Sequence, residues 1–98
     1  MDISNQFEKS FIVHSCEQVL RFSRVGRWDD LSEERKVQLG FNMGVVALGL
    51  QLSKEESFQA LADAREGKVS MQKFRDHLKL LIASHEVKVD EAKIMRPF

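Results

Sequence analysis

The chain has 98 residues, of which 43% are hydrophobic and 31% are charged, and its 15 basic groups balance 15 acidic ones. This composition is typical of one globular domain and excludes a disordered chain, while the neutral net charge gives no general support to nucleic-acid binding. A single cysteine, Cys16, excludes an internal disulfide and fits a reducing compartment. The N-terminus lacks the basic start and apolar core of an export signal, so we expect a cytoplasmic protein.

The first helix is predicted over residues 5–25, which contain neither Gly nor Pro. Its apolar arc is wider than a surface helix needs, so the helix lies at the centre of the fold or is half covered by another molecule. Gly26 is placed to end it in a left-handed cap. The opposite side is a narrow polar strip of His14, Glu17, Arg21 and Arg24.

The second helix is predicted over residues 32–50, with Asp30 or Ser32 as its cap. Residues 37–52 contain no charge and hold three of the five glycines, so this segment must be buried on most sides by the rest of the fold or by a partner. Its alternation of apolar and small or polar residues also fits a strand. The alternative is therefore an α+β fold with a small hairpin at 37–50.

Two further helices are predicted over residues 53–66 and 70–84. Ser53 and Glu56 have the spacing of a capping box, and Ser70 caps the second of these helices. The chain after residue 84 is a tail that holds one short helix from Asp90 or docks as an extended arm.

The predicted fold is a single all-α domain over residues 1–98, a compact bundle of four main helices with a short C-terminal tail. Residues with large apolar side chains at helical spacing form the expected core. They are Phe7, Phe11, Val19, Leu20, Phe41, Val45, Leu48, Phe58, Leu61, Phe74, Leu78 and Leu81.

No constellation in the sequence points to catalysis. His14 and Cys16 are two residues apart and diverge on a helix, and His77 and His85 have no third ligand near them. Cys16 falls in an apolar sector, where a thiol behaves as a small hydrophobe. We therefore expect a protein that is not an enzyme, has no metal and no cofactor, and does not span a membrane.

The expected function is that of a non-enzymatic protein–protein interaction module: a small inhibitor, immunity-type protein or adaptor that presents an acidic helical face to a protein with a basic surface. Residues 29–66 hold eight acidic and four basic groups, although solvated helix faces would give the same pattern. Self-association through the first or second helix is a further expectation. The expected contact residues are Trp28, Asp29, Asp30, Glu33, Glu34, Glu55 and Glu56.

The alternative function is a helix-turn-helix-like DNA-binding regulator. Residues 45–50 followed by a helix that begins at Ser53 resemble such a motif in residue type, with a small residue, a glycine turn and a serine-started helix, although the connection is slightly too long. The would-be recognition helix carries four acids and two bases, so we expect nucleic acid to be an unfavourable partner.

Overall fold

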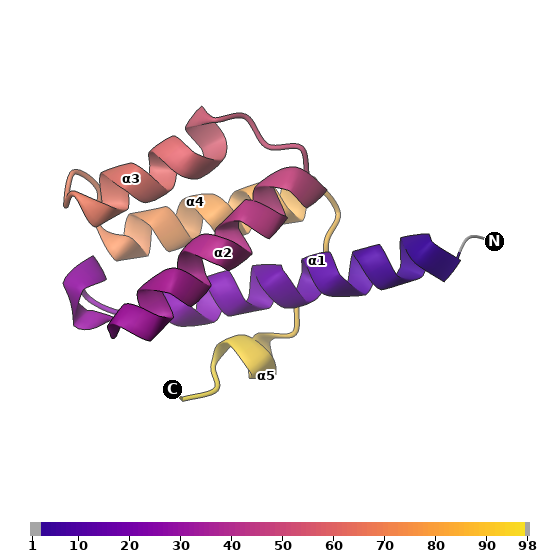
Figure 1. The fold of residues 1–98 in the computed structure, drawn as a ribbon, viewed down its shortest axis with the longest axis horizontal. Coiled ribbons are helices and arrows are strands. Elements are labelled where there is room, and N and C mark those ends of the chain that lie inside the picture. The colour runs from indigo at the N-terminus through magenta and orange to yellow at the C-terminus, as the bar shows by residue number, and fades with distance from the viewer. Residues whose placement is uncertain (1–2, 98) are drawn as a thin grey trace.

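The computed structural model describes the backbone of residues 3–97 and the side chains of residues 9–97. Over this range the chain forms five α-helices and no strand, which confirms the predicted all-α bundle (Figure 1). The hairpin alternative at 37–50 is wrong, because one uninterrupted helix covers this segment. The helices are α1 (Ile3–Phe22), α2 (Glu33–Gly49), α3 (Ala60–Arg65), α4 (Met71–Ser84) and α5 (Glu91–Ile94).

Two short turns complete the secondary structure. A 3-10 turn, η1 (Trp28–Asp30), precedes α2, and a π-helical turn, η2 (Glu55–Gln59), continues directly into α3. Figure 1 shows α2 lying diagonally across α1, with α3 and α4 on one side of α1 and α5 on the opposite side. The N-terminal turns of α1 extend beyond the other helices.

The side chains at the helix starts explain most of the boundaries. The Ser32 and Ser70 hydroxyls accept hydrogen bonds from the backbone N–H groups three residues later, at 3.2 and 3.1 Å. The predicted capping box is confirmed: the Ser53 hydroxyl accepts from the Glu56 N–H at 3.1 Å, and the Glu56 carboxylate accepts from the Ser53 N–H at 2.9 Å. After α3, Gly67 turns the chain with a φ of +77°.

The end of α1 differs from the prediction. The helix stops at Phe22, and Gly26 is not in the left-handed region. The Ser23 hydroxyl donates to the Leu20 carbonyl at 3.0 Å, and the Ser23 carbonyl accepts a hydrogen bond from Arg75 at 2.8 Å. These contacts satisfy the polar groups at the end of the helix without a glycine cap.

The core contains side chains from every helix, and five of the predicted core residues belong to it. Among its largest fully buried side chains are those of Phe74, Leu20, Leu39, Met43 and Leu78. The predictions of burial are confirmed for Val19, Leu20, Leu61, Phe74 and Leu78.

The other core predictions that fall on described side chains are wrong. Phe11, Phe41, Leu48 and Phe58 are exposed, and Val45 and Leu81 are half-buried. Phe7 lies outside the residues whose side chains are described. A helix such as α2, apolar on two opposite sides, gives no signal in its own sequence of which side faces inward.

The polar strip of α1 binds the C-terminal tail. Asp90 caps α5 as predicted, accepting from the Ala92 N–H at 2.9 Å, and the buried Glu17 carboxylate accepts from the Asp90 N–H at 2.7 Å. Arg24 donates to the Ile94 carbonyl at 3.2 Å, and Arg21 donates to the Pro97 carbonyl at 2.7 Å. The tail is thus docked on α1 by charged side chains that meet its backbone.

We expect the substitution of alanine for glycine to have opposite effects on stability at two positions of α2. A Cβ at Gly49 would lie 2.6 Å from two atoms of Ile12, whereas a Cβ at Gly44 would have no atom within 4 Å. We expect Gly44→Ala to raise the free energy of unfolding by about 0.5–1 kcal/mol through helix propensity. Gly49→Ala should lower it by about 1–2 kcal/mol, because the Ile12 side chain of α1 must shift to admit the methyl group.

Urea unfolding at low chain concentration measures both effects, and each variant is the control for the other. Equal shifts of the urea midpoint in the same direction would contradict the close packing of α1 against the end of α2.

Candidate interaction surfaces

The structure divides the predicted contact residues into two groups. Trp28, Asp29 and Asp30 in η1 lie beside Glu33 and Glu34 in the first turn of α2. The remaining two, Glu55 and Glu56, begin η2, after the chain has run the length of α2 (Figure 1). Since α2 has 17 residues, it is about 26 Å long. The seven residues therefore do not form one continuous acidic face.

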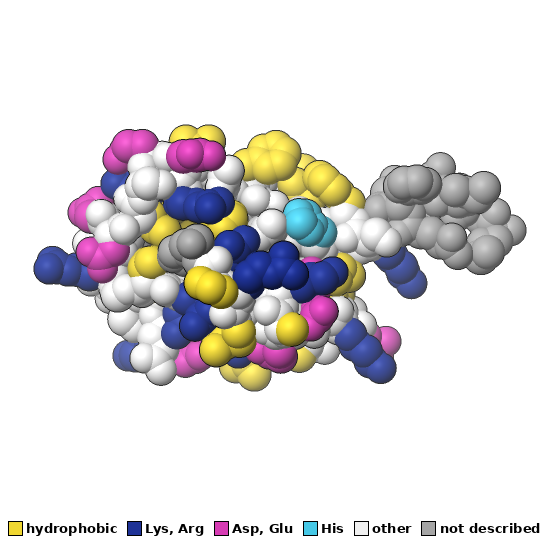
Figure 2. Space-filling view, turned by 90° about the horizontal axis from the view of Figure 1, so that it is seen from below, with side chains coloured by type: hydrophobic (Ala, Val, Ile, Leu, Met, Phe, Trp, Pro, Cys, Tyr) yellow, Lys and Arg dark blue, Asp and Glu magenta, His cyan; other side chains and the backbone are white. Residues whose placement is uncertain are grey.

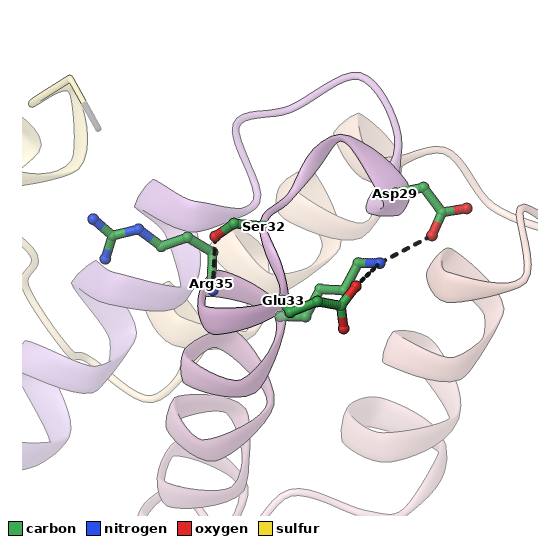
Figure 3. Close-up of polar contacts among 5 residues, drawn as sticks. Asp29, Ser32, Glu33 and Arg35 are labelled. Atoms are coloured by element: carbon green, nitrogen blue, oxygen red, sulfur yellow. Dashed lines mark hydrogen bonds and ion pairs between the residues drawn. The ribbon is translucent and has the colours of Figure 1, made fainter.

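Hydrogen-bond donors of the chain itself already contact the carboxylates of the first group. Figure 3 shows the Asp29 and Glu33 carboxylates turned toward one ammonium group, that of Lys36, at 3.2 and 3.1 Å. Hydrogen bonds from the ammonium to Glu33 and then to Asp29 raise the pKa of Lys36 above its usual value. The Asp30 carboxylate accepts from the Arg27 N–H at 3.0 Å. Residues 27–36 contain four acids and three bases, so this end of the molecule has little net charge.

In the second group, Glu56 acts as a capping residue. Hydrogen bonds from the backbone and side chain of Ser53 hold the pKa of the Glu56 carboxyl below its usual range. Glu55 is exposed at the start of the turn. Helix capping therefore accounts for Glu56 without any partner.

Trp28 lies beside a shallow hollow between η1 and the loop that joins α3 to α4. The hollow has a volume of about 360 Å³, and Arg65 and Gly67 contribute to its wall. The Arg65 guanidinium lies 5.4 Å from the centre of the indole ring, a cation–π contact that holds the half-buried Trp28 in place. The indole thus already has a contact within the fold.

The largest departure from prediction is an apolar surface on the outer side of α2. Val37, Phe41 and Leu48 are 71%, 65% and 82% exposed. In the order Val37, Phe41, Gly44 and Leu48, successive residues are four, three and four positions apart. This spacing aligns them along one side of the helix. We call these four residues the outer face of α2.

The opposite side of α2 supplies the helix's contribution to the core, through Leu39, Met43, Val46 and Leu50. α2 is therefore apolar on both sides, and the fold buries only one of them. In Figure 2, hydrophobic side chains gather along the upper edge, which corresponds to the front of Figure 1, where α2 lies. Contiguous exposed apolar surface of this kind is typical of interaction sites.

A group of basic side chains marks the opposite side of α1. Figure 2 shows Lys and Arg side chains near the middle of this face, beside a histidine. A hollow of about 260 Å³ there is lined by His14, Arg21, Lys93 and Arg96, among others. Because Arg21 holds the backbone of the tail, this group is first a structural contact between α1 and α5.

The fold also determines the environment of Cys16 and of the residues that could bind a metal ion. Cys16 is fully buried, and burial together with the charge of Glu17 raises the pKa of its thiol to about 12. Among the described residues, no three His, Cys, Asp or Glu side chains are grouped to hold a metal ion. None of the described helices combines the length and apolar character needed to cross a bilayer.

Comparisons with models of known protein families, with curated proteins and with solved structures give no significant match for this chain.

The buried thiol predicts the reactivity of Cys16 and its effect on stability. Since the thiol stays protonated in the folded chain, we expect iodoacetamide to alkylate it at pH 8 at least about 100-fold more slowly than in urea-unfolded chain. Above pH 9 the unfolded thiol loses its proton while the folded one keeps it until about pH 12. The Cys16 contribution to stability therefore falls as pH rises from 9 to 12.

Mass spectrometry of timed alkylation, with and without urea, measures the rates. The variant Cys16→Ser, unfolded by urea at pH 8 and pH 10, is the control for the pH effect. Rapid labelling of the folded chain at pH 8 would contradict the burial.

Proposed function

We propose that this chain is a non-enzymatic protein-interaction module whose contact surface is the outer face of α2. The observation that carries the proposal is the exposure of Val37, Phe41 and Leu48 on a helix whose opposite side already fills the core. Burial of a large apolar side chain contributes roughly 1.5–3 kcal/mol when it is complete. Three such side chains on one rigid helix are therefore a substantial source of binding energy.

The shape of the surface supports the same conclusion. Added Cβ atoms at Gly40 and Gly44 would have no atom within 4 Å, so the backbone of α2 is open to outside contact at both positions. Another protein's side chains can approach closely at Gly44, which lies between the exposed Phe41 and Leu48. The surface combines raised aromatic and aliphatic groups with recesses, which favours specific packing over general adhesion.

Charged residues lie at the border of the apolar surface. Glu33 and Glu34 are exposed in the first turn of α2, one turn before Val37. Charges at the rim of an interface influence mainly the rate of association and the choice of partner. A small inhibitor, immunity-type protein or adaptor would use its surface in this way, with the apolar face for affinity and the acidic rim for selection of a basic partner.

The DNA-binding alternative has less support. The segment that would read the major groove is η2 followed by α3, and it begins with Glu55 exposed and Glu56 turned back onto Ser53. Carboxylates at this position repel the phosphate backbone.

A photoreactive amino acid at the outer face tests the proposed function. We expect a benzoylphenylalanine in place of Phe41 or Leu48 to form covalent adducts with a defined protein in the native host, because these positions lie inside the interface. Leu80 in α4, which is 74% exposed, is the matched control position. Equal adduct patterns from Leu80 and from both α2 positions, or no protein adduct at all, would contradict the proposal.

The acidic rim makes a separate prediction. Where the protein captured by the α2 positions has a basic surface, we expect Glu33→Lys with Glu34→Lys to slow its association by about 10-fold at low salt, since the encounter loses its electrostatic steering. Surface plasmon resonance over a range of salt concentrations measures the rate. Glu86→Lys, an exposed change in the loop after α4, is the control, and helicity of both variants should match the parent.

A further inference from the structure

The outer face of α2 is complementary to itself in an antiparallel arrangement, and we propose that its occupant is a second copy of this chain. This inference rests on the proposed function, because it names the partner of the same surface. The complementarity follows from the order of large and small residues along α2 and from the position of its charges.

The residues that meet in an antiparallel pair are fixed by one register. When Phe41 of one copy faces Gly44 of the other, the residue numbers of every facing pair add up to 85. Val37 then faces Leu48, and the two-fold axis repeats each contact in reverse. The large ring thus lies opposite the position without a side chain, and two aliphatic side chains flank it at each end.

The same register keeps charged groups at the ends of the pair. Glu34 lies one turn before Val37 and faces the end of the other copy's helix, where α2 stops at Gly49 and Gln51 turns the chain with a φ of +54°. No charged residue lies between positions 37 and 52, so no buried ion would be left unpaired along the interface.

A parallel pair would be unfavourable both in the packing of its side chains and in the position of its charges. Phe41 would meet Phe41 and Gly44 would meet Gly44, which leaves crowding at one level and a void at the next. Glu33 and Glu34 of the two copies would lie together at the same end, where like charges repel. In the antiparallel pair these acids are separated by about the 26 Å length of the helix, and the two helix dipoles oppose each other.

The surface available to the pair sets the expected affinity. Contact through a single helix from each copy is smaller than the roughly 800 Å² per partner of a standard stable interface. We therefore expect a reversible dimer with a dissociation constant of roughly 1–100 µM, rather than an obligate one. The folded monomer has its own core, which agrees with an equilibrium between two folded states.

Sedimentation of the purified full chain over a wide concentration range tests the inference. The mass should rise from 11.3 kDa toward twice that value with increasing concentration. Phe41→Glu should weaken the dimer by at least about 10-fold, since it places a charge in the seam. Leu80→Glu, an equivalent change on α4, should leave the dimer unaltered, and circular dichroism should show parental helicity in both variants.

A reciprocal exchange tests the register. Gly44→Phe alone should weaken the dimer by about 10-fold, because two rings would then meet at one level. The double variant Phe41→Gly with Gly44→Phe should restore affinity to within about 3-fold of the parent, since each ring again faces a glycine. A cysteine at both 37 and 48, in a Cys16→Ser background, should form a disulfide-linked dimer under mild oxidation.

The outcomes separate this inference from the proposed function. A parent chain that stays monomeric at about 500 µM overturns self-association, and if the α2 photoprobes still capture a different protein, the proposed function stands. A dimer insensitive to Phe41→Glu overturns the α2 interface itself. Efficient cross-linking of a chain with cysteine only at position 37 would overturn the antiparallel register, because the two thiols would then lie at opposite ends of the contact.

Discussion

The fold depends on one constraint: α2 is apolar on two opposite sides, and a bundle of this size buries only one of them. Leu39, Met43 and Val46 enter the core, where they belong to one cluster with buried side chains of α1, α3 and α4. The other side of the helix, with Phe41 and Leu48, remains in contact with water. The packing of α2 therefore leaves an exposed apolar surface, which is typical of interaction sites.

Local chemistry made the helices predictable, whereas the choice of buried face depends on distant partners. Ser53, Ser70 and Asp90 begin helical segments through hydrogen bonds to the next few residues, so their roles could be inferred from spacing alone. The buried face of α2 depends on where α1 crosses it, which no local pattern records. The sequence pattern therefore predicts Phe41 in the core, although it also indicates that the uncharged segment needs cover from the fold or from a partner.

The distinction between local contacts and contacts with distant residues also explains which roles of polar residues could be predicted. The sequence predicts the acids at the start of α2 as contact residues for a partner. In the structure, however, the Lys36 ammonium already bridges Asp29 and Glu33. Conversely, Glu17 belongs to the polar strip of α1, yet it is buried and its carboxylate accepts a hydrogen bond from the backbone at Asp90. That contact joins residues 73 positions apart in the sequence, and only the tertiary structure could reveal it.

The glycines of the chain are consistent with the contact that we propose at the outer face of α2. Gly67 has a positive φ, and Gly49 lies against Ile12, so the monomer itself accounts for both. Gly40 and Gly44 have ordinary helical backbone and open space around them, yet each costs a helix about 0.5–1 kcal/mol relative to alanine. Nothing within the described fold offsets that cost. Close approach of a second helix would offset it, and Phe41 of another copy has the size and position to fill the recess at Gly44.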